Sequence, residues 1–376
     1  MSKHISFFMP SLRGGGAENV FVKIASYLAA NMDYRIDLVV ATAEGPLRQK
    51  LHPKVRLIDF GKHRVIHTIV PLSIYLRKER PDVLLSTMTH TNVVAAASIY
   101  LSGCHRIRFV VREANYFSKL CQHARYFNEK SSLTLARWVY RHVDKVVVPS
   151  KDMADDLCKT LRISRKKIAI IYNPVDIKQI YALANEEVHH PWLADKSNIP
   201  LILSVGRLVP QKGFDVLLQA IAEIRKSRAV RLIILGEGQQ RSALFRLSEK
   251  LKIADVVEMP GFVDNPYPYM KHASVFVLSS NYEGMPNVLL EALALGTPIV
   301  STDCPSGPRE ILRDGDFGLL VPVGNAQAMA GAILSILDAP EQYGMTPERE
   351  VWIRQNFDLK QVAQKYIQIL NPTKEA

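Results

Sequence analysis

Residues 273–302 read ASVFVLSSNYEGMPNVLLEALALGTPIVST and predict a strand, a helix and a second strand in that order. The runs ASVFVLSS and TPIVST are nearly continuous in apolar residues, which is typical of strands that are buried on both faces. Pro286 fits the first turn of a helix, and Gly296, Thr297 and Pro298 would end that helix. A strand–helix–strand unit of this kind predicts a parallel sheet with helices packed on it.

The same alternation of apolar runs and amphipathic segments extends along the whole chain of 376 residues. It is interrupted at residues 173–199 by a polar stretch, and the length suits two domains of about 150–200 residues. We therefore expect an α/β protein with two doubly wound, Rossmann-like domains that face each other across a ligand-binding cleft. The expected domains are residues 1–185 and 186–350, and a helical tail, residues 351–376, is expected to cross back to the first domain.

The net charge of +12 is concentrated in the first half of the chain. Residues 1–200 hold 30 lysines and arginines against 17 acidic residues, whereas residues 201–376 hold 18 against 19. This excess of cations indicates an anionic partner, either nucleic acid or an acidic membrane surface. The start of the chain lacks the features of a signal peptide, and no apolar run reaches the roughly 20 residues of a spanning helix. We expect a protein that is neither secreted nor membrane-spanning, with its four scattered cysteines reduced.

Two glycine-containing loops each follow an expected strand and precede an expected helix. The first, GGGAE at residues 14–18, would let a ligand approach the backbone at a helix N-terminus, although a tight turn without a ligand would use the same residues. The second, GRLVPQKGF at residues 206–214, carries Arg207 and Lys212 at the carboxyl edge of the sheet. Two such cations would neutralise a diphosphate, although a solvated basic loop is also possible.

Glu283 and Glu291 lie eight positions apart, before and within the helix of the opening stretch. The amides of Asn287, Val288 and Leu289 are expected to be unpaired at the helix start and to attract phosphate or an oxygen-rich sugar. Carboxylates accept hydrogen bonds from sugar hydroxyls. A surface position for Glu291 is the alternative, but apolar residues flank it on both sides. The stretch therefore predicts a site for phosphate or for an oxygen-rich sugar.

Taken together, the motifs GGGAE, GRLVPQKGF, LGEG, GFVDN and EGMPNVLLEALALGTPIVSTDCPSGPREIL resemble the family 4 retaining glycosyltransferases of the GT-B fold. Within that family, the chain is similar to bacterial N-acetylhexosaminyl transferases that extend lipid-linked oligosaccharides. The resemblance covers nearly the whole chain and is densest in residues 200–325. It implies that residues 1–185 bind an acceptor and face the membrane, and that residues 186–350 bind a nucleotide-sugar donor.

The resemblance also implies roles for individual residues. Arg207 and Lys212 would bind the donor diphosphate and stabilise the departing charge, and Glu283 would contact the transferred sugar, so that these three are the expected catalytic residues. Glu291 would bind the ribose of the donor. The other donor-binding residues that the resemblance implies are Gly15, Gly16, Gly236, Gly238, Val263, Met285, Pro286, Asn287 and Val288.

The chain departs from the family pattern in one loop. Many relatives carry a histidine after the strand that corresponds to RIRFVV, whereas this chain reads VREANY, with Arg112, Glu113 and Asn115. These three residues and His90 are the candidates for contact with the acceptor or the transferred sugar, and a capping or packing role for His90 stays open.

The resemblance implies an oxocarbenium-like transition state with negative charge growing on the diphosphate. Two cations already offset that charge and no Asp-x-Asp motif stands in a metal-binding context, so we expect neither a metal ion nor a cofactor. UDP is the expected nucleotide, and a polyprenyl-diphosphate-linked or other lipid-linked saccharide is the expected acceptor. The segment TDCPSGPREIL, residues 302–312, favours an N-acetylhexosamine or a hexose as the transferred sugar, whereas the linkage is not specified.

Two basic and apolar segments, residues 61–80 and 119–142, could lie on an anionic lipid surface, although part of each must also pack on the sheet. We therefore expect a cytoplasmic protein that is peripheral on the inner face of the cell membrane. A GT-B sugar-nucleotide epimerase is one alternative, and a donor-binding protein without catalysis is another. A nucleic-acid-binding protein is disfavoured because the chain has no recognition-helix motif, so nucleic acid is not an expected partner.

Overall fold

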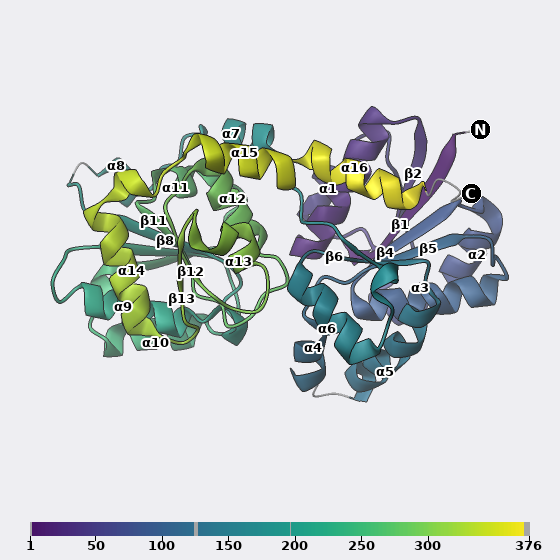
Figure 1. Ribbon diagram of the computed structural model, residues 1–376, viewed down its shortest axis with the longest axis horizontal. Coiled ribbons are helices and arrows are strands. Elements are labelled where there is room, and N and C mark those ends of the chain that lie inside the picture. The colour runs from purple at the N-terminus through teal and green to yellow at the C-terminus, as the bar shows by residue number, and fades with distance from the viewer. Residues whose placement is uncertain (1, 124–126, 196, 372–376) are drawn as a thin grey trace. The chain divides into compact units, whose positions relative to one another are not determined.

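The computed structural model describes residues 2–123, 127–195 and 197–371, and contacts within the chain divide it into two compact units (Figure 1). The first unit comprises Met1–Pro174 together with Leu359–Ala376, and the second comprises Val175–Asp358. Among the described residues, no helix combines the length and the apolar character needed to cross a membrane.

The described part of the first unit contains a seven-stranded parallel sheet in the order β3-β2-β1-β4-β5-β6-β7. The strands are β1 (Lys3–Ser11), β2 (Tyr34–Thr42), β3 (Arg56–Asp59), β4 (Val83–Thr87), β5 (Arg108–Arg112), β6 (Lys145–Val148) and β7 (Ile168–Ile170). The α-helices are α1 (Gly16–Asn31), α2 (Ile69–Glu79), α3 (Thr89–Ser102), α4 (Phe117–His123), α5 (Phe127–His142), α6 (Lys151–Leu161) and α16 (Leu359–Leu370). The 3-10 helices are η1 (Pro46–Lys50), η2 (Val65–Thr68) and η3 (Arg165–Lys167).

Side chains on both faces of this sheet are buried, because successive residues of a strand point to opposite faces. Phe7 of β1 packs with α1 and α16 in one core, and its ring meets that of Phe21 edge to face at 5.3 Å between centroids. Phe8, the next residue, belongs to a second core with α2, α3, α5 and α6. Figure 1 shows α16 beside α1, which it contacts. The predicted parallel sheet with two covered faces is confirmed for this unit.

The described part of the second unit contains a six-stranded parallel sheet in the order β10-β9-β8-β11-β12-β13. The strands are β8 (Leu201–Val205), β9 (Arg231–Leu235), β10 (Val257–Gly261), β11 (Val275–Leu278), β12 (Ile299–Thr302) and β13 (Leu319–Val321). The α-helices are α7 (Ile177–Leu183), α8 (Pro191–Ala194), α9 (Phe214–Ile224), α10 (Arg241–Lys250), α11 (Tyr267–His272), α12 (Asn287–Leu295), α13 (Pro308–Ile311), α14 (Ala326–Asp338) and α15 (Pro347–Asn356). The 3-10 helices are η4 (Pro210–Lys212), η5 (Ala254–Val256), η6 (Arg313–Gly315) and η7 (Pro340–Gln342).

The units divide at Pro174 and Val175, whereas the sequence placed the boundary between residues 185 and 186. The difference arises because α7 packs against α11 and α12, and the Tyr181 hydroxyl donates to the carbonyl of Ala294 at 3.0 Å. A second division between the units falls inside the expected tail, residues 351–376. The end of α15 belongs to the second unit, and all of α16 belongs to the first.

A buried ionic cluster joins three strands of the first sheet to α2. Asp37 of β2 has no exposed surface and accepts hydrogen bonds from His4 of β1, Arg56 of β3 and Tyr75 of α2 at 2.9, 2.5 and 2.5 Å. Burial by itself raises the pKa of the Asp37 carboxyl, but the hydrogen bonds from His4, Arg56 and Tyr75 outweigh it and lower that pKa well below its usual range. The folded state therefore favours the ionised carboxylate.

We predict that this cluster makes the first unit sensitive to acid. Because the folded pKa of Asp37 lies below the unfolded pKa, its contribution to the free energy of unfolding is complete above the unfolded pKa and declines as the pH falls. The expected slope is about 1.4 kcal/mol per pH unit between the two pKa values. Hydrogen exchange of the β2 amides, followed from about pH 6 to about pH 3, would measure the decline.

The variant Asp37→Asn should be about 3 kcal/mol less stable near neutral pH, because the hydrogen bonds of His4, Arg56 and Tyr75 to a fully buried carboxylate are lost or weakened. It should also lose less stability than the wild type on acidification. Asp33→Asn, at an exposed position just before β2, is the matched control. Equal acid sensitivity in the wild type and Asp37→Asn would contradict this explanation.

Candidate active site

The loops that follow β8, β11 and β12 lie at one edge of the second sheet. These strands are parallel neighbours, with Val275 paired with Ile202 and Phe276 paired with Ile299. Because parallel neighbours end at the same edge, the loops at their carboxyl ends are brought together. The loops comprise residues 206–213, 279–286 and 303–307.

An ion pair joins the first two loops. The Nζ of Lys212 lies 2.5 Å from Oε1 of Glu283, and their side chains are 14% and 8% exposed. The hydroxyl of Ser280 donates to the same carboxylate oxygen at 2.6 Å. Two donors therefore converge on one nearly buried oxygen, where a charge-assisted hydrogen bond is stronger than on an exposed surface. Arg207, on the same loop as Lys212, is exposed.

Further hydrogen bonds hold these two loops in register. The amide of Asn281 donates to the carbonyl of Gln211 at 2.8 Å, and the Gln211 side chain donates to the carbonyl of Tyr282 at 2.9 Å. Gly213 has a φ of +59°, and a Cβ there would lie 2.2 Å from the carbonyl oxygen of Ser279. A side chain at position 213 would push the loops apart and separate Lys212 from its carboxylate.

The loop after β12 supports Glu283 from its other side. The Glu283 amide donates to the carbonyl of Pro305 at 2.7 Å, and the Ser306 hydroxyl donates to the carbonyl of Gly284 at 2.7 Å. Burial and then the negative charge of Glu283 raise the pKa of the Cys304 thiol to about 12. The thiol therefore stays protonated at neutral pH and adds no charge beside the ion pair.

Helix α12 begins one residue later than the sequence predicted, and one of its first amides is already bonded. Pro286 is the residue before the helix, and the Leu289 amide donates to its carbonyl at 3.1 Å. The expectation that the Leu289 amide is unpaired was therefore wrong, because the first turn closes on Pro286. Met285 is buried, and Asn287 and Val288 are partly buried at the helix start.

Glu291 lies in the second turn of α12 and is 6% exposed, so it is not a surface helix residue. The hydroxyl of Tyr267 on α11 donates to its Oε1 at 3.3 Å. Burial and then the charge of Glu291 raise the pKa of the Tyr267 hydroxyl well above its usual range. The hydroxyl therefore keeps its proton and orients the Glu291 carboxylate.

A buried arginine stabilises the far end of α12. Arg349 of α15 is 1% exposed, and its guanidinium donates to the carbonyls of Leu293 at 3.1 Å, Thr297 at 2.9 Å and Tyr343 at 3.0 Å. Burial lowers its pKa to about 10, so the cation persists at neutral pH. A cation at a helix C-terminus is favourable, and here it fixes the helix that carries Glu291.

The loops after β9 and β10 contain three of the expected donor-binding residues, Gly236, Gly238 and Val263. A Cβ at Gly236 would lie 2.0 Å from the carbonyl oxygen of Gly206, and a Cβ at Gly238 would lie 2.4 Å from that of Leu208. Glycine is therefore required at both positions for the loops after β8 and β9 to touch. Val263, in the loop after β10, is partly buried.

Gly15 and Gly16 belong to the first unit, where they are exposed at the start of α1. A Cβ at Gly15 would lie 2.2 Å from the buried carboxyl group of Glu18. The absence of a Cβ at position 15 leaves room for the Glu18 carboxyl group. The fold therefore requires glycine at this position, in addition to any contact with a ligand.

The acceptor candidates fall into two groups. His90 and Asn115 are exposed, whereas Arg112 and Glu113 are 1% and 0% exposed. Arg112 donates to the Asn173 side chain at 2.6 Å. Its side chain points into the unit, in contrast to the surface position that contact with an acceptor requires.

The carboxylate of Glu113 is surrounded by donors of its own unit. It accepts hydrogen bonds from Thr89 at 2.7 Å, from Tyr140 at 2.6 Å and from the Ala114 amide at 2.9 Å. Burial raises its pKa and outweighs the lowering effect of these hydrogen bonds. In this conformation Glu113 holds the edge of the sheet together.

Sequence reasoning did not identify Ser280, Tyr267 or Arg349. Ser280 stands three residues before Glu283 at a strand end, which is a signal that could have been used. Tyr267 lies 24 residues from Glu291, and Arg349 lies 56 and 52 residues from Leu293 and Thr297 at the end of α12, so that no local pattern points to these contacts.

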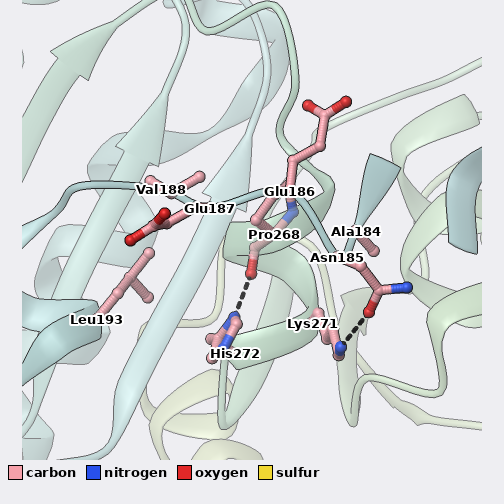
Figure 2. A pocket seen from close by; sticks show the side chains of 9 residues that line it. All are labelled: Ala184, Asn185, Glu186, Glu187, Val188, Leu193, Pro268, Lys271 and His272. Atoms are coloured by element: carbon pink, nitrogen blue, oxygen red, sulfur yellow. Dashed lines mark hydrogen bonds between the residues drawn. The ribbon is translucent and has the colours of Figure 1, made fainter. Parts of the chain in front are cut away.

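A separate pocket of about 380 Å³ lies between the segment after α7 and helix α11 (Figure 2). Two of its polar side chains are bonded to other lining residues, since Lys271 donates to the Asn185 side chain at 2.6 Å and His272 donates to the Pro268 carbonyl at 2.8 Å. The residues that line it include none of those in the loops after β8, β11 and β12.

Comparison with known families matches both parts of the chain. Residues 14–179 match the family described as Glycosyltransferase Family 4, and residues 186–356 match the family described as Glycosyl transferases group 1. The two matches are consecutive, and they meet between residues 179 and 186, a few residues after the division between the compact units.

Individual relatives include bacterial glycosyltransferases. The N-acetylgalactosamine-N,N'-diacetylbacillosaminyl-diphospho-undecaprenol 4-alpha-N-acetylgalactosaminyltransferase of Campylobacter jejuni is 37% identical over 212 residues, which span 56% of each chain. The lipopolysaccharide core biosynthesis glycosyltransferase LpsE of Rhizobium meliloti is 28% identical over 367 residues, which span 95% of this chain and 96% of LpsE. The alignment thus covers about half of the first relative and nearly all of the second.

Solved structures share the fold. HepE of Anabaena in complex with UDP-glucose superposes with a TM-score of 0.82 at 20% identity, covering 98% of this chain and 99% of HepE. Sucrose-phosphate synthase of Thermosynechococcus elongatus superposes with a TM-score of 0.80 at 20% identity, covering 98% of both chains. The predicted GT-B fold is confirmed.

The consecutive family matches, the full-length relative and the GT-B fold lead to one conclusion: the chain belongs to the family 4 glycosyltransferases, which transfer a sugar from a nucleotide-sugar donor.

Proposed function

We propose that the protein transfers a hexose or an N-acetylhexosamine from a UDP-sugar to a hydroxyl of a lipid-linked saccharide, with retention of configuration at the anomeric carbon. The contact between Lys212 and Glu283, in a loop cluster that also carries Arg207, is the observation that supports it most directly. A cation that suits a diphosphate and a carboxylate that suits sugar hydroxyls are 2.5 Å apart. In a nucleotide-sugar, the diphosphate and the sugar are joined by a single bond, so both lie as close together as the two side chains that suit them.

The names of the relatives support the choice of substrates. The Campylobacter enzyme is named for transfer of N-acetylgalactosamine to a saccharide on undecaprenyl diphosphate, and Anabaena HepE was solved with UDP and with UDP-glucose. LpsE is named for biosynthesis of the lipopolysaccharide core. We carry to this chain a UDP-sugar as donor and a lipid-linked saccharide, polyprenyl-diphosphate-linked or similar, as acceptor.

In the proposed reaction, the bond from the anomeric carbon to the diphosphate oxygen breaks, and an acceptor oxygen bonds to the same face of that carbon. The diphosphate leaves with the bonding electrons and takes the proton of the acceptor hydroxyl, so no separate base is needed. Arg207 and Lys212 stabilise the charge that grows on the diphosphate, and such electrostatic stabilisation is usually the largest catalytic contribution. With two cations supplied by the chain, we propose that the reaction needs no metal ion.

We propose that the donor spans the two glutamates. Glu283 holds hydroxyls of the transferred sugar, and Glu291, oriented by Tyr267, holds the ribose. The remaining proposed donor contacts come from the loops after β1, β9, β10 and β11, namely Gly15, Gly16, Gly236, Gly238, Val263, Met285, Pro286, Asn287 and Val288.

For the acceptor, the exposed residues His90 and Asn115 are better placed than Arg112 and Glu113, whose side chains are buried. We propose that the first unit binds the acceptor and that Arg112 and Glu113 act there by shaping the edge of the sheet. The exposed pair would then contact the saccharide directly.

The same unit carries an apolar stripe with neighbouring cations, which supports peripheral attachment to the inner face of the cell membrane. Ile66, Val70 and Ile74 follow one another at helical spacing on η2 and α2, and each is more than half exposed. Exposed Arg64 and Lys78 lie near its two ends. Apolar side chains beside cations are suited to an anionic lipid surface. Residues 124–126 of the second candidate segment lie outside the described residues.

We predict transfer from at least one UDP-sugar to a short polyprenyl-diphosphate saccharide, with unchanged anomeric configuration in the NMR spectrum of the product. Activity should persist in excess EDTA. Lys212→Ala and Glu283→Ala should each reduce kcat/KM by about 100-fold or more, because charge stabilisation and sugar positioning are lost. Asp33→Asn is the control, and unchanged turnover in both alanine variants would overturn the catalytic assignment.

We predict that Tyr267→Phe raises the KM for the donor by about fivefold and changes kcat little, because it removes one hydrogen bond from the ribose-binding carboxylate. Tyr269→Phe removes a hydroxyl from the same helix without a bond to Glu291 and is the matched control. Steady-state kinetics with the donor varied would separate the two variants. A loss in kcat alone, or equal effects of both substitutions, would contradict the role of Tyr267.

We predict binding to vesicles of phosphatidylglycerol at low salt and weaker binding at high salt, since salt screens the attraction. The triple variant Ile66→Asn, Val70→Asn and Ile74→Asn should reduce vesicle affinity by about tenfold or more because apolar burial is lost. Phe245→Asn, at an exposed position on α10, is the control. Equal co-sedimentation of the triple variant and the wild type would exclude this surface.

A further inference from the structure

Lys212 has two partners that compete for it. In the structure its ammonium group contacts Glu283 at 2.5 Å, and in the proposed reaction it binds the donor diphosphate. An ammonium group is a compact charge on a flexible stem, so that moving it toward one anion weakens its contact with the other. The competition matters because both side chains are nearly buried and water replaces a lost contact poorly.

We propose that Glu283 makes the site distinguish the intact donor from the released nucleoside diphosphate. This inference rests on the proposed function and adds a specificity role to Glu283. When an intact UDP-sugar draws Lys212 toward the diphosphate, the sugar hydroxyls supply Glu283 with new donors. When UDP alone binds, Glu283 loses part of its contact with Lys212 and receives nothing in return.

The surroundings of the pair favour this exchange. Ser280 donates to the same Oε1 as Lys212, so that the carboxylate stays anchored when the ammonium group shifts. A Cβ at Gly206 would lie 3.3 Å from Cε and 3.4 Å from Cδ of Lys212, so glycine leaves room along the stem of the lysine. The carboxylate is therefore held while the cation has space to move.

The consequence is that UDP binds less tightly than the two cations alone would allow. Glu283 reduces the affinity for UDP both by holding Lys212 and by repelling the diphosphate, and the sugar of an intact donor offsets this through its hydroxyls. The product would therefore leave the site readily after transfer. The residue that binds the sugar would also limit product inhibition.

Isothermal titration calorimetry with UDP on the full-length protein tests the proposal. Glu283→Gln keeps the shape of the side chain and removes its charge, so UDP should bind about five- to tenfold tighter than to the wild type. Lys212→Met should weaken UDP binding by about tenfold. The double variant Glu283→Gln with Lys212→Met should bind UDP only slightly more tightly than Lys212→Met alone, because the gain in UDP affinity depends on the freed lysine. Glu283→Gln should increase the affinity for UMP, which lacks the second phosphate, by a smaller factor than the affinity for UDP.

The matched control is Asp303→Asn, which removes one negative charge from the neighbouring loop, where Asp303 pairs with Arg309 rather than Lys212. Unchanged or weaker UDP binding by Glu283→Gln would overturn the proposal, as would an equal gain in Asp303→Asn. If Glu283→Gln also increases UDP affinity in the absence of Lys212, the increase comes from removing the repulsion between Glu283 and the diphosphate, and the role of Lys212 is overturned. Failure of the wild type to bind any nucleotide or UDP-sugar would instead contradict the proposed function.

Discussion

Parallel pairing of β8 with β11 is the constraint on which the candidate active site depends. It places Lys212 and Glu283, which are 71 residues apart in the chain, at the same edge of one sheet. The loops can approach closely because glycine occupies the points of contact. At Gly213 and Gly236, a Cβ would lie 2.2 Å and 2.0 Å from a backbone oxygen of the neighbouring loop. These glycines therefore allow the geometry that the strands set up.

Buried charges occur in both units, and their surroundings indicate different roles. Asp37 and Glu113 are fully buried and take their hydrogen bonds from donors of their own unit, which makes them structural. Lys212 and Glu283 keep some exposure and lie where strands end. A charged pair at such an edge can exchange one partner for a ligand, whereas one enclosed by the core cannot.

Residues before α12, within it and at its end all contribute to the candidate active site or stabilise the helix that carries it. Glu283 precedes the helix, Glu291 lies within it, and Arg349 binds the carbonyls at its end. Tyr267 reaches Glu291 from α11. Displacement of α12 would therefore move both proposed donor contacts together, so buried residues far from the reacting centre still affect the site.

The sequence alone was sufficient for the two parallel sheets, because continuous apolar strands separated by amphipathic helices have few other ways to bury their surface. It also indicated the loops that carry Arg207, Lys212, Glu283 and Glu291, since charged residues stood beside glycines at strand ends. It placed a domain boundary between residues 185 and 186, whereas the compact units divide at Pro174 and Val175, because the packing of α7 on α11 and α12 leaves no local pattern.

Only the tertiary structure decided which polar residues are enclosed and which partner each one has. Arg112 and Glu113 resemble exposed loop residues in the sequence, yet both are buried. The free amide expected at Leu289 is bonded to Pro286. Spacing along a chain identifies strands and loops because those depend on local periodicity. The contacts of Lys212 with Glu283 and of Tyr267 with Glu291 depend instead on strand order and helix packing, which bring together residues that are distant in the sequence.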